Sequence, residues 1–376
     1  MRILYTILGT FNSGGMERVL ANKANYLARL GYEVIIITTD QKNRKPYFDM
    51  DESIQHIDLG INYTDDISKN IFSRTVSYLR KRYLHKARIG AVLNQFRPSI
   101  TISMFDNDVA FITDIKDGSK KIVEIHFSRF KRLQYNRSGI WKVINSYRSK
   151  MDSNIVKKFD RFVVLTEEDK GYWGKLSNIQ VIPNANSFES NEQSILENKQ
   201  VMAVGRFDYQ KGFDELIEIW AKVAETFPEW KLNIYGQGPL RDQYQALINL
   251  LGLSDKVFLN QPQKDIKLIY LEHSVLAMTS RYEGLPMVLL EGQVCGLPMV
   301  SYACKCGPSD IIRDGVNGYL VEEEDKNAFA QKLIAVMQDK SLRQSMGRSS
   351  YNNSKNFEVE KIMQKWITLF DEIIKE

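Results

Sequence analysis

The alternation of strand and helix patterns at the N-terminus restricts the fold more than any other feature of this sequence. Apolar runs predict strands over Ile3–Leu8 and Glu33–Thr39, and between them Met16–Leu30 carries apolar residues at helical spacing. A strand, a helix and a second strand in this order form a βαβ unit, which joins neighbouring strands of a parallel sheet. The sequence therefore predicts an α/β protein that opens with a parallel sheet.

The alternation continues along a chain that is long enough for more than one core. At 376 residues it exceeds what a single hydrophobic core usually organises. We predict a first α/β domain over residues 1–186, a second α/β domain over 187–357, and a final helix over 358–376. The final helix has an apolar stripe that must be buried. The stripe consists of Ile362, Trp366, Leu369, Phe370 and Ile373.

The composition is that of a globular protein, with 43% hydrophobic and 26% charged residues. No stretch approaches the roughly 18 uninterrupted apolar residues that a membrane span needs, and the N-terminus is a predicted strand instead of a signal peptide. We therefore expect a cytoplasmic protein. Cys295, Cys304 and Cys306 form no disulfide framework and no usual zinc spacing, so we expect reduced, structural thiols.

Charge is distributed unevenly between the two halves. Residues 1–185 carry 30 Lys and Arg against 19 Asp and Glu, whereas the rest of the chain is acidic, and the whole chain has a net charge of +5. The stretch from Lys69 to Gly90 has no acidic residue and interleaves basic with apolar side chains. This pattern suits an anionic membrane surface or an anionic lipid-linked acceptor, and it also suits a solvated helical face. No nucleic-acid-binding module accompanies the charge, which disfavours nucleic acid as a partner.

Two glutamates bracket a predicted strand, turn and helix over residues 275–295. Val275–Thr279 has strand length, and apolar residues recur at helical spacing from Leu285 to Cys295, with Pro286 suited to the first turn. Such a turn directs unpaired N–H groups and the positive end of the helix dipole at a ligand, which should be anionic. Glu283 lies in the turn, and Glu291 follows just under two helical turns after Leu285.

A basic pair lies about seventy residues upstream of the two glutamates. Arg206 follows a predicted strand that ends at Gly205, and Lys211 lies at the start of the next predicted helix. Guanidinium and ammonium groups complement phosphate oxygens by charge and by hydrogen bonding. The order of basic pair and glutamates therefore predicts a site for a diphosphate.

With these motifs in place, the sequence resembles glycosyltransferase family 4, which consists of retaining nucleotide-sugar enzymes with two facing Rossmann-like domains, the GT-B architecture. The resemblance covers essentially the whole chain. The motifs that carry it are Gly14-Gly15, Gly205-Arg206, Lys211-Gly212, Gly236 to Pro239, Glu283 to Glu291, Gly307-Pro308 and Asp314 to Gly318. In this architecture the final helix returns to the N-terminal domain.

The resemblance implies a role for each candidate residue. Arg206 and Lys211, helped by N–H groups near Gly284 and Leu285, would stabilise the leaving phosphate. Pro286 would contact the donor from the same loop. Glu283 would hold hydroxyls of the donor sugar, and Glu291 would accept hydrogen bonds from the ribose. Gly15 would border the acceptor and the donor phosphates, Gly236 lies in a turn of the donor domain, and Pro262 would lie near the base. His126, which follows a predicted strand, would lie beside the reacting sugar, although a lone histidine is as often structural. The implied catalytic residues are Glu283, His126, Arg206 and Lys211.

Two cations near the diphosphate make a divalent metal unnecessary, so we expect no metal and no other cofactor. The triplets Asp49 to Asp51 and Asp106 to Asp108 are interpreted as loop carboxylates. The expected function is transfer of a hexose or N-acetylhexosamine from a UDP-linked donor to a glycan or lipid-linked acceptor in envelope polysaccharide synthesis. A nucleotide-sugar epimerase of the same architecture and a non-catalytic nucleotide-binding module are the alternatives.

Overall fold

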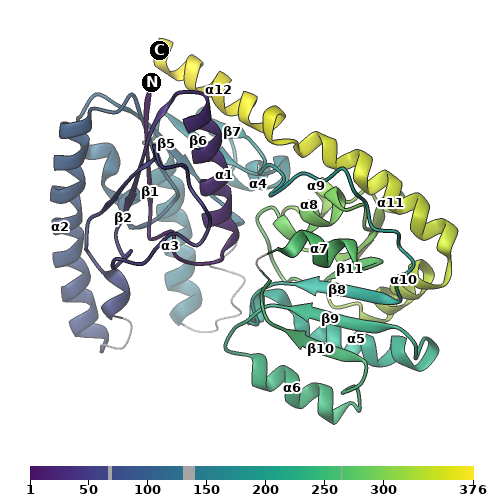
Figure 1. Ribbon diagram of the computed structural model, residues 1–376. Coiled ribbons are helices and arrows are strands. Elements are labelled where there is room, and N and C mark those ends of the chain that lie inside the picture. The colour runs from purple at the N-terminus through teal and green to yellow at the C-terminus, as the bar shows by residue number, and fades with distance from the viewer. Residues whose placement is uncertain (67–69, 130–139, 264) are drawn as a thin grey trace. The chain divides into compact units, whose positions relative to one another are not determined.

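The computed structural model describes residues 1–66, 70–129, 140–263 and 265–376, which divide into two units (Figure 1). The first unit comprises the described residues up to Pro183 together with Ile362–Glu376, and the second comprises Asn184–Lys361. The chain therefore leaves the first unit once and re-enters it within its last helix. The predicted domain boundaries, after residues 186 and 357, lie close to these divisions.

The described strands of the first unit form one parallel sheet in the order β3-β2-β1-β4-β5-β6-β7. Their bounds are β1 (Arg2–Ile7), β2 (Glu33–Thr38), β3 (Gln55–Asp58), β4 (Ile100–Ser103), β5 (Lys120–Glu124), β6 (Arg161–Val164) and β7 (Ile179–Val181). The strand order reverses between β1 and β4. In open parallel sheets, ligands bind beyond the carboxyl ends of the strands at such a reversal.

Helices α1 and α2 of the first unit begin and end for identifiable reasons. The helix α1 (Gly15–Arg29) buries Leu20, Ala24 and Leu27, and it ends before Gly31, whose φ of +82° favours glycine. The helix α2 (Ile71–Phe96) begins where the Asn70 side chain accepts a hydrogen bond from the N–H of Ser73. The other helices of this unit are η1 (Tyr63–Asp66), η2 (Asn107–Ala110), η3 (Ile112–Asp114), α3 (Ile140–Val156) and α4 (Glu167–Trp173).

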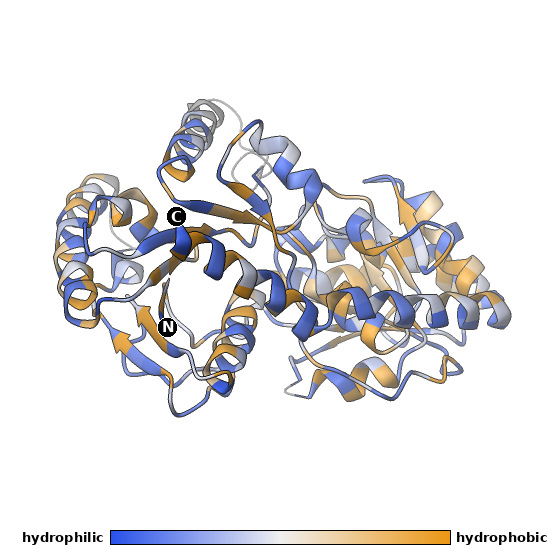
Figure 2. Ribbon diagram, turned by 90° about the horizontal axis from the view of Figure 1, so that it is seen from above, coloured by the Kyte–Doolittle hydropathy of each residue, from blue (hydrophilic) through white to orange (hydrophobic). Residues whose placement is uncertain are grey.

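The last helix, α12 (Val359–Lys375), contributes its residues from Ile362 onward to the first unit. Its predicted apolar stripe is buried, with Trp366 2% exposed and Phe370 fully buried. Figure 2 shows hydrophobic and hydrophilic residues side by side along the helices, as expected for helices that cover a sheet with one face.

The described strands of the second unit form a parallel sheet in the order β10-β9-β8-β11-β12-β13. Their bounds are β8 (Gln200–Val204), β9 (Lys231–Tyr235), β10 (Val257–Asn260), β11 (Val275–Met278), β12 (Met299–Tyr302) and β13 (Gly318–Val321). All residues of β11 and β12 are buried, as expected for strands with both faces covered. Here the order reverses between β8 and β11.

The helices of the second unit include several that the sequence analysis did not predict. They are η5 (Tyr209–Lys211), α5 (Phe213–Thr226), α6 (Arg241–Leu250), α7 (Ile266–Leu271), α8 (Met287–Val294), α9 (Pro308–Ile311), α10 (Lys326–Gln338), α11 (Lys340–Ser354) and η6 (Lys355–Phe357). The unpredicted helix α11 buries Met346 but otherwise mainly small or polar residues such as Gly347, Ser350 and Ser354. It therefore lacks the apolar stripe by which helices are predicted.

Candidate active site

The candidate donor site lies at the carboxyl edge of the second sheet, where β8 and β11 are neighbours. Lys211 lies in the loop that follows β8, and Glu283 lies in the loop that follows β11. Because the strand order reverses between these two strands, their loops border the place where an open α/β sheet binds its ligand. Residues that are far apart in the sequence are thus brought to one site.

Lys211 and Glu283 form an ion pair at this edge. The Nζ of Lys211 lies 2.6 Å from Oε1 of Glu283, and the two side chains are 15% and 8% exposed. Each charge offsets part of the cost of burying the other. The site thereby presents an ammonium group, which suits an anion, within hydrogen-bond reach of a carboxylate, which suits hydroxyl groups.

Arg206 is the exposed cation of the site. Its side chain is 70% exposed, and its Nη2 lies 3.0 Å from Oδ2 of Asp208 and 3.4 Å from Oε1 of Gln210. Exposed ion pairs of this kind contribute little to stability, so the guanidinium can leave Asp208 at small cost. Arg206 is therefore available to turn toward a bound anion.

The two loops are held together at Gly212. This residue has a φ of +61°, and a Cβ at this position would lie 2.2 Å from the carbonyl oxygen of Thr279. The Thr279 hydroxyl donates a hydrogen bond to the Gly212 carbonyl at 2.9 Å. Glycine is required here both by its backbone conformation and by the close approach of the second loop.

Arg281 is a site-building residue that the sequence analysis missed. Its guanidinium donates hydrogen bonds to Asp214 at 2.7 and 3.2 Å, to Glu215 at 2.8 Å and to the Tyr209 carbonyl at 2.7 Å. Burial lowers the pKa of Arg281, but the interactions with Asp214 and Glu215 outweigh burial and raise that pKa above its ordinary value. This cation fastens the loop after β11 to the start of α5. Arg281 lies more than sixty residues after these acids in the sequence, so no local sequence pattern predicted the contacts.

Glu291 lies in α8 and is occupied by a protein donor. The residue is 6% exposed, and its Oε2 accepts a hydrogen bond from the Tyr270 hydroxyl at 2.9 Å. The helix begins at Met287, with Pro286 as its N-cap, so the predicted start at Leu285 was too early. Among the described residues, the carboxylate that pairs with Lys211 is that of Glu283, and Glu291 forms no ion pair with Lys211.

The predicted loop of Gly284, Leu285 and Pro286 is buried. A Cβ on Gly307, whose φ is +101°, would lie 2.5 Å from Cδ of Pro286 and 2.9 Å from the Gly284 carbonyl oxygen. The absence of a Cβ at Gly307 thus allows the loop of residues 284–286 to pack closely against the Gly307 backbone. Such a loop at a helix start leaves N–H groups for an anion.

Gly236 and Pro262 follow the neighbouring strands β9 and β10. A Cβ on Gly236 would lie 1.9 Å from the carbonyl oxygen of Gly205, so glycine is needed there for packing between loops. Pro262 is partly exposed. Donor contacts by either residue remain a prediction.

Two candidate residues lie in the first unit, at the carboxyl edge of its sheet. Gly15 is the exposed first residue of α1, directly after the loop that follows β1. His126 follows β5 by two residues, its side chain is 7% exposed, and its Nε2 lies 3.7 Å from Oε2 of Glu124. The contact with Glu124 was not predicted.

The interpretation of Asp108 as a loop carboxylate is wrong. Asp108 lies in η2, is 1% exposed, and accepts a hydrogen bond from the Thr6 hydroxyl at 2.7 Å. Burial raises the pKa of Asp108 to about 6, and burial together with the charge of Asp108 raises the pKa of Asp106 to about 7. Asp49 and Asp51 are exposed, as predicted. Within the described ranges, no three His, Cys, Asp or Glu residues are grouped so that they could hold a metal ion.

The basic amphipathic stretch forms most of α2, except that Lys69 lies outside the described residues. Phe72, Val76, Leu79 and Tyr83 are 81%, 54%, 58% and 81% exposed. Their spacing places them along one side of the helix. Some of the basic residues have partners within the first unit: Lys81 pairs with Asp66, Lys86 with Asp114, and Arg88 donates to the Leu59 carbonyl. No helix among the described residues has the length and apolarity required to cross a membrane.

The three cysteines are free and buried, as expected for structural thiols. Burial, helped by the charge of Glu291, raises the pKa of the Cys295 thiol to about 12.

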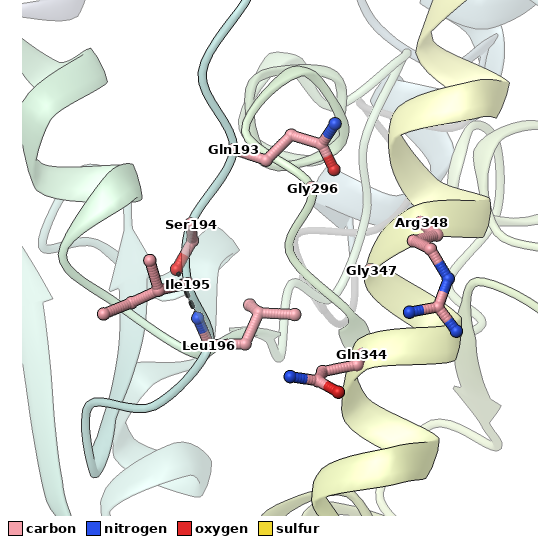
Figure 3. A pocket seen from close by; sticks show the side chains of 8 residues that line it. All are labelled: Gln193, Ser194, Ile195, Leu196, Gly296, Gln344, Gly347 and Arg348. Atoms are coloured by element: carbon pink, nitrogen blue, oxygen red, sulfur yellow. Dashed lines mark hydrogen bonds between the residues drawn. The ribbon is translucent and has the colours of Figure 1, made fainter.

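A pocket of about 210 Å³ lies elsewhere in the second unit (Figure 3). It is lined by Gln193, Ser194, Ile195, Leu196, Gly296, Gln344, Gly347 and Arg348. No predicted site residue lines it. Its walls come from residues 193–196, from Gly296 and from α11. A Cβ on Gly347 in α11 would lie 2.5 Å from the carbonyl oxygen of Gly296.

Two Rossmann-like units with a cation and carboxylate pair at a switch point define a protein of the GT-B class. Family models agree with this class. The model for Glycosyltransferase Family 4 matches residues 13–186, and the model for Glycosyl transferases group 1 matches residues 186–353. The chain belongs to glycosyltransferase family 4 and is a glycosyltransferase.

Curated relatives are similar over part or all of the chain. An uncharacterized glycosyltransferase of Haemophilus influenzae is 27% identical over 370 residues, 97% of this chain and 98% of that protein. The amylovoran biosynthesis glycosyltransferase AmsD of Erwinia amylovora is 35% identical over 217 residues, 55% of this chain and 61% of that protein. An alpha-1,4-N-acetyl-D-galactosaminyltransferase of Campylobacter jejuni, whose name includes a glycan linked to PP-undecaprenol, is 26% identical over 373 residues, 98% of each.

Solved structures share the fold across the whole chain. The sucrose-phosphate synthase of Thermosynechococcus elongatus has a TM-score of 0.84 at 17% identity and covers 100% of this chain and 99% of its own. The pneumococcal O-GlcNAc transferase GtfA in complex with UDP and GlcNAc has a TM-score of 0.77 at 17% identity, with the same coverage. These likenesses show the GT-B fold, as predicted.

Proposed function

We propose that the protein is a retaining transferase that moves a hexose or N-acetylhexosamine from a UDP-linked donor to a glycan or lipid-linked acceptor in cell-envelope polysaccharide synthesis. The observation that carries the proposal is the pair of Lys211 and Glu283 at the switch point of the second sheet. One ammonium and one carboxylate at 2.6 Å suit a ligand whose phosphate adjoins a hydroxyl-bearing sugar.

Each residue has a chemical task in this proposal. Lys211 and Arg206 stabilise the charge that develops on the leaving diphosphate, together with N–H groups at the start of α8. Glu283 accepts hydrogen bonds from the donor sugar, and Glu291 accepts them from the ribose after Tyr270 yields. The acceptor hydroxyl attacks the anomeric carbon on the face from which the diphosphate leaves, and a phosphate oxygen takes its proton. Anomeric configuration is thereby retained.

The reaction requires no divalent metal in this proposal, because two protein cations supply the positive charge. Transfer by the purified enzyme should therefore persist when a chelator such as EDTA is present. A strict requirement for added Mg²⁺ or Mn²⁺ would contradict this part of the proposal.

The names of relatives support the acceptor and donor classes. The Campylobacter relative is named for an undecaprenol-linked glycan, the Erwinia relative for amylovoran biosynthesis, and the pneumococcal neighbour was crystallised with UDP and GlcNAc. A lipid-linked acceptor resides at a membrane, and the exposed apolar side chains of α2 are suited to binding a membrane surface.

The stripe of Phe72, Val76, Leu79 and Tyr83 fits peripheral binding to the inner face of an anionic membrane. The exposed cations Arg74 and Arg80 lie on the same helix. Apolar insertion and attraction to anionic lipid act together in such helices. Sedimentation with phosphatidylglycerol vesicles should be lost in a variant with Leu79→Ser and Tyr83→Ser. The control is Leu250→Ser, which removes an equally exposed apolar residue from α6 of the second unit.

The decisive experiment incubates the purified protein with a panel of nucleotide sugars, with and without lipid-linked glycans. Release of UDP that increases with acceptor, together with a glycosylated product of retained configuration, is expected. An epimerised donor without acceptor would identify an epimerase, and tight donor binding without turnover would identify a binding module. Lys340→Met is a matched control for site variants, because Lys340 forms an exposed ion pair with Glu197 at 2.7 Å, outside the site.

A further inference from the structure

A buried ion pair in the first unit brings together four segments of the chain near His126. Lys23 of α1 lies with its Nζ 2.6 Å from Oε2 of Glu124, and the two side chains are 6% and 1% exposed. The same Nζ lies 3.5 Å from the ring centroid of Trp366 in α12 and 5.4 Å from that of Tyr5 in β1. The ammonium is therefore enclosed by one carboxylate and two aromatic faces.

This enclosure keeps Glu124 charged. Burial raises the pKa of the carboxyl, but its interactions with Lys23 and His126 outweigh burial and hold the pKa of Glu124 well below its ordinary value. Burial lowers the pKa of Lys23, and Glu124 opposes that effect. A buried carboxylate with a fixed charge can orient a neighbouring imidazole, because it accepts a hydrogen bond from one ring N–H and thereby selects the tautomer.

Glu124 and His126 are placed for such a contact. They are two residues apart where β5 ends, so their side chains leave the extended chain on the same side. The Nε2 of His126 lies 3.7 Å from Oε2 of Glu124, which is longer than a hydrogen bond. Oε1 of Glu124 and both ring nitrogens of His126 are buried and have no hydrogen-bond partner among the described residues.

We propose that Glu124 is the positioning residue of His126, and that Lys23, which Trp366 covers, holds the Glu124 carboxylate in place. The inference rests on the proposed function and on the place beside the reacting sugar that the family resemblance implies for His126. A ring movement of less than 1 Å converts the 3.7 Å contact into a hydrogen bond. The second ring nitrogen then has a defined protonation state toward the substrate. The last helix of the chain thus completes the first-unit site.

The test variant replaces both charges, Lys23→Met with Glu124→Gln. Removing only one partner would leave an uncompensated buried charge, whereas neutralising both is usually tolerated. The matched control is Lys121→Met with Asp117→Asn, a second buried ion pair of the same unit that does not touch His126. Thermal midpoint and UDP affinity should stay near the wild-type values in both double variants.

Transfer kinetics give the first readout. The test variant should lower kcat by about tenfold with little change in acceptor KM, as His126→Ala should, because both disturb the imidazole and not the binding surface. Combining the test variant with His126→Ala should add no further loss, since both act through one group. A normal kcat in the test variant, or losses that multiply, would overturn the positioning role while leaving the transferase proposal intact.

A spectroscopic readout is independent of transfer. The chain has four histidines, so ¹⁵N-labelled imidazoles can be assigned by substitution. The ¹⁵N shifts of His126 should change their tautomer signature in the test variant, while those of His56, His85 and His273 and those of the control stay unchanged. Unchanged His126 shifts would refute the inference, and absent transfer in the wild-type enzyme would refute the proposed function separately.

Discussion

Lys211 and Glu283 are separated by 72 positions in the sequence, and their side chains meet at 2.6 Å. The contact exists because β8 and β11 are neighbours in the sheet and both loops leave it at the same edge. In the proposed function, the donor therefore enters a site whose charges already compensate each other. The diphosphate would compete with Glu283 for the Lys211 ammonium, and this competition would release the carboxylate to accept hydrogen bonds from sugar hydroxyls.

Neutralising one member of this pair should cost both activity and stability. Glu283→Gln should lower kcat by about 100-fold, the usual loss when a transition-state contact is removed. It should also destabilise the fold, because Lys211 remains buried with less compensation. The double variant Lys211→Met with Glu283→Gln should recover most of the thermal midpoint but none of the activity. Recovery of activity together with stability would show that the pair has only a structural role.

Glu291 should bind the ribose, and UDP affinity tests this directly. Hydrogen bonds to a charged group contribute about 1.5–3 kcal/mol, so Glu291→Gln should weaken UDP binding by at least about tenfold in calorimetry. Tyr270→Phe is the matched control, because it removes the hydroxyl that donates to Glu291 in the free protein and leaves the carboxylate. UDP binding should be kept in that control. Equal effects of both substitutions would assign Glu291 to packing with Tyr270.

Gly212→Ala should disrupt the site through the backbone. The added Cβ would lie 2.2 Å from the carbonyl oxygen of Thr279, and φ is +61°. Gly252→Ala is a control with the same backbone conformation, since φ is +67° there but no atom lies within 4 Å of the added Cβ. Chemical denaturation should show a loss of about 1 kcal/mol for the control, from backbone strain alone, and a clearly larger loss for Gly212→Ala. Equal losses would mean that the Thr279 loop moves aside freely.

The sequence was sufficient for the fold because both sheets are built from buried, apolar strands. Predicted strands such as Lys231–Tyr235 form with the predicted ends. The strands β3 and β7 were missed because they are short and none of their residues is fully buried, so they lack the run of apolar residues by which the other strands were predicted.

The site was only partly predictable, for a different physical reason. Arg206, Lys211 and Glu283 were recognisable because each follows a strand that ends at one sheet edge. The partners Arg281, Tyr270 and Glu124 were not recognisable, because their contacts depend on tertiary packing between segments distant in sequence. Asp108 was misjudged because a D-x-D triplet does not reveal whether it will be buried.

The neighbouring carboxyl groups of Asp106 and Asp108 should make the stability of the fold depend on pH. Their folded pKa values, about 7 and about 6, exceed the ordinary 3.8, so the folded protein binds protons more tightly than the unfolded chain. The contribution to stability is therefore fully present below about pH 4 and lost as the pH rises through 6 to 7. Asp108→Asn keeps an acceptor for Thr6 and should be more stable than the wild type at pH 8, by about 2–3 kcal/mol.

At pH 4 the Asp108→Asn variant should have the same free energy of unfolding as the wild type. His85 titrates in the opposite sense, since burial lowers its pKa to about 4, but it is present in both proteins and cancels in the comparison. Asp49→Asn, at an exposed position, is the control and should show no such difference. Denaturant unfolding at the two pH values measures the effect, and parallel curves for Asp108→Asn and the wild type would contradict it.

Trp366 should stabilise the first unit partly as an aromatic cover for the Lys23 cation. Trp366→Phe keeps an aromatic face near the ammonium, whereas Trp366→Leu keeps only apolar volume, and desolvated cation–π contacts contribute up to about 2 kcal/mol. Trp366→Leu should therefore be the less stable variant in urea unfolding. The comparison is repeated in the background of Lys23→Met with Glu124→Gln, where no cation remains. The difference between Phe and Leu should vanish there, because it depends on the charge and not on the size of the side chain. A difference that persists in the uncharged background would show that α12 is held by shape alone.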